Sequence, residues 1–419
     1  MEILYGDFSI MNELNENLLS YEKAKEIMFN SISKNKVEII DIEKCVDRIL
    51  AENIFSKINI PEFSNSAVDG FGLISSKKKI RKLKIVGESK PGKPFLGKIN
   101  KEQAIKVFTG AYVIKRITNV DTVCMEEDVE ENGNEIMIRN NLKKGSNIRI
   151  KGEDVKKNKK IFDVGRRIRS VDLSQLSSLG LKKIKVYKKL KVGIFSSGDE
   201  LCEITHKKKR YQIFDSNKFS LLSLFKKIGC EVIDLGIIRD NFIETERKIS
   251  KKIDFLDLIV TSGGVSKSKT DMIGKFLKKK GKILFWRLSI KPGRPFAFGK
   301  LKNVPFIGLP GNPVAAVITF FMLVINYVNR LSGLTDIPIV ERLLPCDFDL
   351  KKKKGRTEWL RGKITKKNQS YFITRFPSTG SGIISSISQS QGIIELEKNS
   401  SFIKKGTLLK FYRYEDMLN

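Results

Sequence analysis

Four separate stretches of this 419-residue chain place small and acidic residues directly after an apolar run. They are Gly198–Glu200, Asp240, Ser262–Asp271 and Gly308–Asn312. Glycines at such positions let the backbone come close to a ligand, and a following helix offers free N–H groups to an anion. Carboxylates there could hold Mg²⁺ or position water beside phosphate groups. The residue types therefore indicate chemistry on an anionic, phosphate-bearing substrate.

The third stretch, FLDLIVTSGGVSKSKTD, has the clearest internal order. Residues 256–260 form an apolar, partly β-branched run typical of a buried strand, two glycines follow, and a helix is predicted from Asp271. An ordinary strand–helix loop explains this stretch alone about as well as an anion-binding turn does. Four polar turns together are stronger evidence for a binding site than one turn alone, because the carboxyl ends of parallel strands meet at one ligand-binding edge of the sheet.

Composition excludes several other chemistries. His206 is the only histidine, so acid–base work must fall to carboxylates and lysines. The five cysteines are scattered without zinc or redox spacing, which indicates free thiols and a cytoplasmic protein. The N-terminus has no signal-peptide pattern, and the apolar run 314–328 is predicted to be a buried core helix and not a membrane span.

The formal net charge of +32 raises the question of nucleic-acid binding. Lysines occur in runs throughout the chain, however, and they are not interleaved with aromatic residues as a base-stacking surface requires. No helix-turn-helix, finger or RNA-recognition pattern is present in the sequence. We therefore favour a solvated basic surface over a nucleic-acid interface.

The elements expected around these turns define a multi-domain α/β protein. Residues 11–56 are predicted to be helical, 74–142 to form short strands, and 164–180 to form a helix that ends at Gly180. From residue 183 strands alternate with helices, which predicts a parallel sheet. Asp215 or Ser216 is expected to cap one of these helices, and Asn312 with Pro313 to begin another. Residues 335–419 are expected to be all-β.

The motifs, taken together and in order, resemble one family. The segments that carry the resemblance are FSNSAVDGF, VFTGA, RIKGED, FSSGDEL, IFDSN, GCEVIDLGIIRD, TSGGVS, FWRLSIKPGRPFAFG, GLPGNP, GRTEWLRG and GSGIISS. They are similar to the MoeA and gephyrin E-domain family, the molybdopterin molybdenumtransferases. The resemblance implies four domains: a helical linker and dimerisation domain (1–56 and 143–182), a small β domain (57–142), a MogA-like α/β catalytic domain (183–332) and a C-terminal β domain (335–419).

The same resemblance implies an enzyme that inserts molybdate at the dithiolene of adenylylated molybdopterin and releases AMP with the help of Mg²⁺. The positions implied as catalytic are Asp69, Thr109, Asp154, Glu200, Asp240 and Asp271, and those implied as metal ligands are Glu200, Asp240 and Asp271. Positions implied for substrate and molybdate are Ser262, Gly263, Gly264, Lys291, Arg294, Pro295, Arg361 and Ser381.

The residue types at these positions are compatible with the implied roles, but they are also compatible with purely structural roles. Lys291 and Arg294 flank the Pro292–Gly293 turn and, with Arg361, could clamp a small dianion. A lysine outside the motifs, Lys352, is expected to play no part. The acidic residues could also be turn, capping or strand-end residues, and Lys291 and Arg294 could be ordinary surface charges.

The family is a homodimer, which implies a site between the α/β domain of one subunit and the small β domain of the other. The implied partners are the molybdopterin adenylyltransferase and apo-molybdoenzymes, with no membrane. This sequence departs from the pattern at Ser268–Asp271, where SKTD replaces the usual GEYD or GEAD, and at Arg287, where lysine is usual. The SKTD change keeps open a non-catalytic, molybdopterin-binding or scaffold protein of the same fold.

Overall fold

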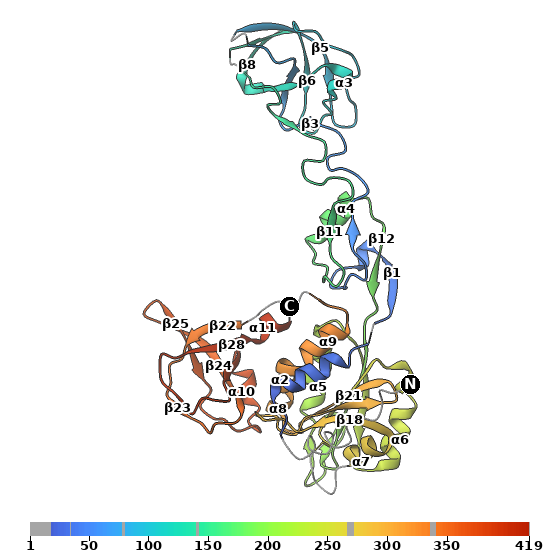
Figure 1. The fold of residues 1–419 in the computed structure, drawn as a ribbon, viewed down its shortest axis with the longest axis vertical. Helices are drawn as coiled ribbons and strands as arrows, with labels where there is room; N and C mark the ends of the chain where they lie inside the picture. Colours follow the sequence, from blue (N-terminus) through green and yellow to red (C-terminus); the bar gives the residue numbers. More distant parts are fainter. Residues whose placement is uncertain are drawn as a thin grey trace, which may run out of the picture.

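The computed structural model describes residues 18–33, 35–77, 80–139, 142–265, 272–335 and 341–418. The molecule is elongated (Figure 1). A small β domain lies at one end, a slender middle region follows, and the α/β domain lies beside the C-terminal β domain at the other end. Residues expected at one site are therefore distributed along a long molecule.

The α/β domain contains the predicted parallel sheet. Its strand order is β16-β13-β17-β21-β20-β18, parallel over the first four strands and antiparallel over the last two. The strands are β13 (Lys191–Ser197), β16 (Glu231–Ile238), β17 (Leu258–Ser262), β18 (Gly281–Trp286), β20 (Ala297–Leu301) and β21 (Val304–Leu309). The helices are α5 (Asn217–Lys227), α6 (Phe242–Ser250), α7 (Met272–Lys280), α8 (Pro313–Thr319) and α9 (Ile325–Leu331).

Two apolar clusters of this domain fix the sheet in place. One contains α5, α8, α9 and side chains such as Val192 and Val260, and the other contains α6, α7 and side chains such as Phe195 and Ile259. Because successive side chains of a strand point to opposite faces, neighbouring strand residues enter different clusters. Helices thus cover both faces, and the polar strand ends remain at the edge of the sheet.

The apolar segment Pro313–Leu331 is one helix long enough to cross a membrane, and it has a π-helical turn at Phe320–Val324. Of its most hydrophobic window, 89% is buried inside the molecule. The helix therefore has the packing of a core helix, as the sequence predicts. Pro313 occupies its first turn, where a missing N–H costs nothing.

The N-terminal region differs from its prediction. Within the described part of residues 11–56, only α2 (Tyr21–Asn30) is an α-helix, and Ile42–Lys44 is a short 3-10 turn. Helix α2 packs in the larger cluster of the α/β domain through Ala24 and Met28. Residues 37–41 instead form β1 (Val37–Asp41), which pairs with β12 (Lys183–Tyr187), because a β-branched run with an available partner strand overrides helix-forming charge spacing.

The middle region is built from short pieces. It contains the β1–β12 pair, β2 (Ile54–Phe55) with β11 (Lys160–Phe162), and α4 (Asp172–Ser178). The helix predicted over 164–180 is thus only seven residues long. The residues before α4 form backbone hydrogen bonds with residues 48–50. This tertiary pairing restricts the helix to the C-terminal half of the predicted segment 164–180.

Both remaining domains are β structures, as predicted. The small domain has a six-stranded sheet: β7 (Thr122–Met125), β4 (Gly70–Leu73), β6 (Gln103–Val107), β5 (Arg81–Ser89), β9 (Glu135–Ile138) and β8 (Val129–Asn132). It also has α3 (Lys115–Thr118) and β3 (Asn65–Ser66) paired with β10 (Ile148–Arg149). The C-terminal domain comprises β22 (Glu341–Pro345), β24 (Thr357–Lys367), β25 (Ser370–Arg375), α10 (Ser385–Ser388), β26 (Gly392–Leu396), β28 (Leu408–Arg413) and α11 (Tyr414–Leu418).

We expect the buried carboxylate at the start of α4 to stabilise the middle region in a pH-dependent way. Asp172 is 5% exposed and accepts hydrogen bonds from Arg166, Arg169 and the Arg169 backbone N–H. Burial raises the pKa of this carboxyl, but the hydrogen bonds outweigh it and lower the pKa to about 2. Because the folded pKa lies below the unfolded value, this stabilisation is complete above about pH 4 and is lost as pH falls toward 2.

Asp172→Asn should therefore reduce stability by roughly 2 kcal/mol at neutral pH. Scanning calorimetry from pH 7 to pH 2 should show the difference from the wild type shrinking below pH 4. A difference that stays constant over this range would show that the carboxylate charge is not the cause.

Candidate functional site

A pocket of about 220 Å³ lies at the carboxyl ends of β13, β17 and β21. Its lining comes from the four stretches expected to meet there and from the KPGRP motif: Ser197, Gly198, Glu200, Asp240, Gly263, Gly264, Val265, Pro295, Pro310 and Gly311. Asp271 lies outside the described residues. The fold thus brings Glu200, Asp240, Gly263, Gly264 and Pro295 to one place, although they lie far apart in the sequence.

Hydrogen bonds at the tip of β13 hold the acidic wall of the pocket. The Ser197 hydroxyl donates to Asp240 Oδ1 at 3.1 Å, and the Asp240 backbone N–H donates to Asp199 Oδ1 at 3.1 Å. The Arg239 guanidinium donates to the carbonyls of Gly198, Asp199 and Leu201. Arg239 therefore fixes the turn that carries Glu200 and places a cation behind a carboxylate-rich rim.

The glycine turn after β17 is packed too closely for any side chain. Gly263 has φ +85°, and a Cβ there would lie 2.5 Å from the backbone oxygen of Ser197. Asn217 braces the same turn from α5, since its side-chain amide donates to Ser262 Oγ at 2.6 Å and to the Gly311 carbonyl at 2.7 Å. Ser262 is thus buried behind the pocket and does not line it.

The carboxylates of the pocket repel one another. Burial raises the pKa of Asp240, and the negative charges of Asp199 and Glu200 raise it further, while the hydrogen bond from Ser197 partly offsets this. A divalent cation would relieve the repulsion. The described part of the chain holds no group of three acidic, histidine or cysteine side chains able to bind a metal. Mg²⁺, however, needs only one or two carboxylates when waters and substrate phosphates complete its shell, and Glu200 with Asp240 fit that requirement.

The small β domain carries a second polar constellation. Thr109 donates from both its backbone N–H (2.6 Å) and its hydroxyl (2.8 Å) to Asp69 Oδ1. These bonds hold the pKa of Asp69 below its usual value and keep the exposed carboxylate ionised. Asp154 is exposed in the middle region. Within one chain, this end of the molecule is remote from the α/β pocket (Figure 1).

Known proteins match the chain over nearly its whole length. Three family models match residues 19–180, 193–330 and 344–414. In that order they describe the "MoeA N-terminal region (domain I and II)", a "Probable molybdopterin binding domain" and the "MoeA C-terminal region (domain IV)". A molybdopterin molybdenumtransferase of Haemophilus influenzae is 35% identical over 96% of this chain and 100% of that protein. The chain belongs to the MoeA family.

Other relatives agree with this assignment. A gephyrin of Dictyostelium discoideum is 29% identical over 94% of this chain and 62% of its own length. The crystal structure of a molybdopterin biosynthesis MoeA protein from Pyrococcus horikoshii OT3 matches with a TM-score of 0.81 and 26% identity, covering 95% of this chain and 100% of that one. The MoeA-family chain therefore shares both sequence and multi-domain fold with these relatives.

The cationic side chains expected to clamp molybdate are not assembled in the MoeA-family chain. Lys291 Nζ pairs with Glu358 at 3.1 Å, whereas Arg294 is exposed. Arg361 is only 1% exposed and donates to Ser386 Oγ and to the carbonyls of Ser378 and Gly380. Glu358 and Arg361 stand an odd number of residues apart on β24, so Lys291 and Arg361 are held on opposite faces of that strand.

Arg361 instead organises a loop that reaches the α/β domain. The loop carries Ser381, whose hydroxyl accepts a hydrogen bond from Asn312 at 3.0 Å and whose carbonyl accepts one from the Val314 N–H. Asn312 stands at the N-cap position of α8, as predicted, but its side chain makes this interdomain contact and no capping hydrogen bond. At the other predicted cap, Asp215 accepts from the Asn217 and Lys218 N–H groups.

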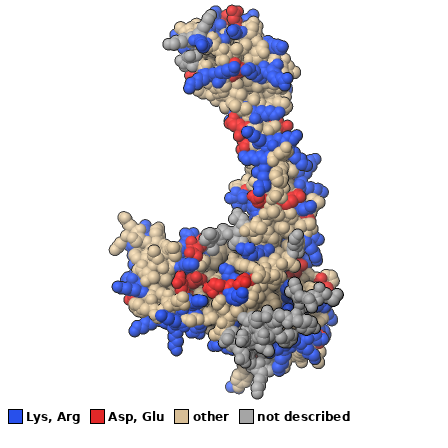
Figure 2. All heavy atoms as spheres, viewed as in Figure 1, with Lys and Arg blue, Asp and Glu red and all other residues tan. Residues whose placement is uncertain are grey.

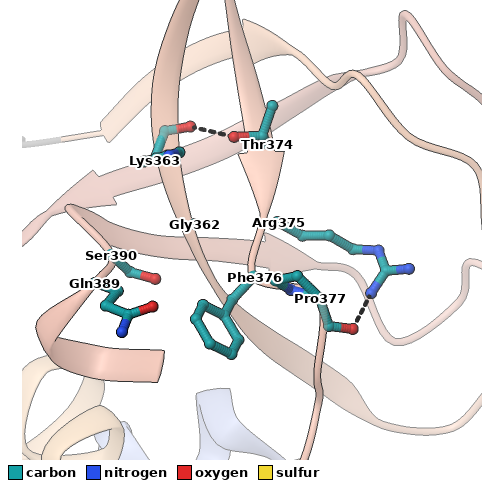
Figure 3. Close-up of a pocket in the computed structure, with 8 residues that line it drawn as sticks. All are labelled: Gly362, Lys363, Thr374, Arg375, Phe376, Pro377, Gln389 and Ser390. Atoms are coloured by element: carbon teal, nitrogen blue, oxygen red, sulfur yellow. Dashed lines mark hydrogen bonds between the residues drawn. The ribbon is translucent and has the colours of Figure 1, made fainter. Parts of the chain in front are cut away.

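Figure 3 shows a second pocket beside the same loop, with a volume of about 380 Å³. It lies between the β24–β25 hairpin and residues 389–390, and Arg375 at its rim donates to the Pro377 carbonyl. None of the predicted site residues lines it. Figure 2 shows Lys and Arg on all domains on the face in view.

Sequence analysis did not identify the roles of three side chains, Lys352, Arg239 and Asn217. Lys352 is no idle surface charge, because its ammonium donates to the carbonyls of Arg356, Glu397 and Ser400. Arg239 and Asn217 brace the pocket turns from behind. Both lie inside motifs that the sequence displays, GIIRD and FDSN, so motif membership was the one available signal.

The contact beneath Gly263 can be tested against a glycine with similar backbone geometry. Gly236 in β16 has φ +73° with nothing near its missing Cβ. Gly236→Ala should cost about 1 kcal/mol for the left-handed backbone alone, and Gly263→Ala should cost about 1–3 kcal/mol more for the clash with Ser197. Scanning calorimetry of both variants measures the difference. Equal losses would contradict the close packing of the pocket turns.

Proposed function

We propose that this chain is a molybdopterin molybdenumtransferase that inserts molybdate into adenylylated molybdopterin and releases AMP. The observation that carries the proposal is the convergence of three glycine-containing strand ends on one pocket with Glu200 and Asp240 in its wall. The motifs that build this pocket are those of the MoeA family, and relatives that match 96% and 92% of the chain bear this name.

The residues in and behind the pocket have separate proposed roles. The glycine turns line the pocket with backbone and no side chain, so anionic parts of the substrate can approach the backbone closely, and at Gly263 a Cβ would clash with the Ser197 carbonyl. Arg239 and Asn217 keep the turns rigid. Glu200 and Asp240 would hold Mg²⁺, which would supply neutralisation of the negative charge on the substrate phosphates. Positioning and charge neutralisation, with no covalent nucleophile, then account for the reaction.

The proposed active form is a homodimer in the cytoplasm. Asp69 and Thr109 are ordered and exposed, yet remote from the pocket of their own chain, so a second copy is needed to bring them to a pocket. Large apolar side chains are exposed on the segment that follows Glu200, including Tyr211, Ile213 and Phe214. Such a cluster suits a protein contact. All five cysteines are buried free thiols, which suits a reducing compartment.

Turnover is tested by incubating the protein with adenylylated molybdopterin, molybdate and Mg²⁺ and measuring AMP release. The wild type should release AMP and form molybdenum cofactor. Asp240→Asn should slow release about a hundredfold or more, because one Mg²⁺-binding, charge-bearing group is lost. Asp254→Asn, which removes an exposed carboxylate paired with Lys302, is the matched control and should act like the wild type. Tight binding without turnover would favour the scaffold alternative.

The shared site is tested by mixing two inactive variants. Asp69→Asn and Asp240→Asn homodimers should each be nearly inactive. Co-refolded or co-expressed mixtures should regain about a quarter of wild-type activity, because half of the dimers are mixed and each carries one intact site. A mixture as inactive as its parents, with mixed dimers verified by differential tagging, would show that each site lies within one chain.

A further inference from the structure

A pocket of about 650 Å³ lies in the small β domain, and the proposed reaction does not use it. Its wall comes from three segments, within residues 63–64, 113–121 and 144–151, and it includes neither Asp69 nor Thr109. Helix α3, which contributes to this wall, lies at the end of the molecule opposite the α/β domain (Figure 1). The volume falls in the range of small-molecule binding sites, roughly 300–1,000 Å³.

The inner wall of this pocket is apolar. Val113 and Val120 are 2% and 0% exposed and join the pocket to a core cluster of the small domain. Phe63 and Ile150 also line it, yet they remain 44% and 66% exposed. Large apolar side chains that stay exposed around a hollow offer surface that a bound molecule can cover.

Hydrogen bonds between the three segments form the pocket in advance. The Val113 N–H donates to the Ser64 carbonyl at 2.8 Å, and the Lys151 N–H donates to the Ser64 hydroxyl at 3.2 Å. The Gly145 N–H donates to the Asp121 carbonyl at 2.9 Å. A ligand therefore meets walls that are already ordered, which reduces the entropic cost of binding.

Cationic side chains surround the apolar wall. Four of them line the pocket: Lys115, Arg116, Lys144 and Lys151. Lys115 and Arg116 are exposed on α3, and their side chains have no hydrogen-bond or ion-pair partner within the described part of the chain. The Lys151 ammonium lies over the Phe63 ring, 5.7 Å from its centroid, so a cation stands directly beside apolar surface.

The single carboxylate in the wall does not cancel this charge. Asp121 accepts hydrogen bonds from the Ser75 N–H at 2.7 Å and from the hydroxyls of Ser75 and Thr122. Its nearest cation is Lys144, whose Nζ lies 3.9 Å away. Asp121 is thus satisfied by its own neighbours, and the pocket keeps an excess of positive charge.

We propose that this pocket binds a small amphipathic anion, an apolar ring that carries a phosphate or carboxylate group. The ring covers the surface around Phe63 and Ile150, and the anionic group meets the cations of α3, where the planar guanidinium of Arg116 suits either head group. An exposed charge contact alone is weak, so both halves of the ligand are needed. The inference is independent of the proposed function.

The first test is a fluorescence anisotropy titration of the full chain with 1-naphthyl phosphate and with 1-naphthoate. We expect saturable binding of one molecule per chain, and the tighter of the two anions identifies the preferred head group. Binding of 1-naphthol, and of inorganic phosphate added as a competitor, should be about tenfold weaker or more, because each lacks one half of the ligand. No saturable binding of either anion, or equal binding of 1-naphthol, would overturn the proposal.

Two pairs of variants locate the bound probe. Ile150→Glu should weaken binding about tenfold or more, whereas Ile243→Glu, at a residue 75% exposed on α6, should leave it unchanged. The double variant Lys115→Gln/Arg116→Gln should also weaken binding about tenfold. Its control is Lys353→Gln/Lys354→Gln, an adjacent pair of exposed cations in the C-terminal domain, which should bind like the wild type.

Equal losses in a variant and its control would show that general surface charge or stickiness attracts the probe, and the proposal would fall. Thermal unfolding verifies that each variant is folded at the assay temperature. Should Ile150→Glu not fold, the double variant decides the question, because both of its side chains are exposed and without partners in the described residues.

AMP release separates this pocket from the proposed active site. The Lys115→Gln/Arg116→Gln variant should release AMP like the wild type while it binds the probe weakly. A parallel loss of AMP release would show that the pocket belongs to the substrate site, which would overturn the inference of a separate ligand. If the wild type releases no AMP, the proposed function fails, and the probe titrations alone decide whether the pocket binds amphipathic anions.

Discussion

The close approach of two backbone segments, the Gly263 turn and the Ser197 carbonyl, is the constraint on which the pocket depends. At this point β13 and β17 both end, and no side chain fits between them. The two segments can approach this closely only because residue 263 is glycine in the left-handed region, and the Gly263 N–H is held by the Leu309 carbonyl. Arg239 and Asn217 act beside the same constraint: Arg239 donates to carbonyls of the turn after β13, and Asn217 links Ser262 to the Gly311 carbonyl of the turn after β21.

Charge in the molecule is organised locally, even though the chain is strongly basic. The pocket wall is acidic, with Asp199, Glu200 and Asp240 close enough to affect one another. Three cationic side chains are engaged, Arg239 behind the turn, Arg361 in its loop and Lys291 with Glu358, whereas Arg294, next to the lining residue Pro295, is exposed. Among the described residues that line the pocket there is no lysine or arginine, so its wall offers carboxylates and backbone and no free cation.

The contact between the C-terminal and α/β domains explains why the GRTEWLRG and GLPGNP motifs occur together. Arg361 orders the loop that carries Ser381, and Ser381 meets Asn312 at the start of α8. Strand β19, which follows β18 of the α/β domain, pairs directly with β24 of the C-terminal domain. The two domains are thus joined by hydrogen bonds next to Gly311, a residue that lines the pocket.

Local pattern was sufficient for the parallel strands, the glycine turns and the β domains, because alternation, apolar runs and turn residues act over a few neighbouring positions. It was also sufficient to bring Glu200, Asp240 and Gly263 to one edge, since parallel strands leave no other place for their carboxyl ends. It failed for residues 37–56 and 164–171, where pairing with distant segments replaced the expected helices.

The sequence by itself determined which residue types stand at the strand ends, and hence the kind of chemistry the pocket can support. Only the tertiary structure decided what each charged side chain touches. Lys291 and Arg361 are candidate cations in the sequence and Lys352 is not, yet Lys291 pairs with a buried carboxylate, Arg361 is buried in a loop and Lys352 holds three carbonyls. The partners of a long, flexible cation come from other strands and loops, so no local pattern records them.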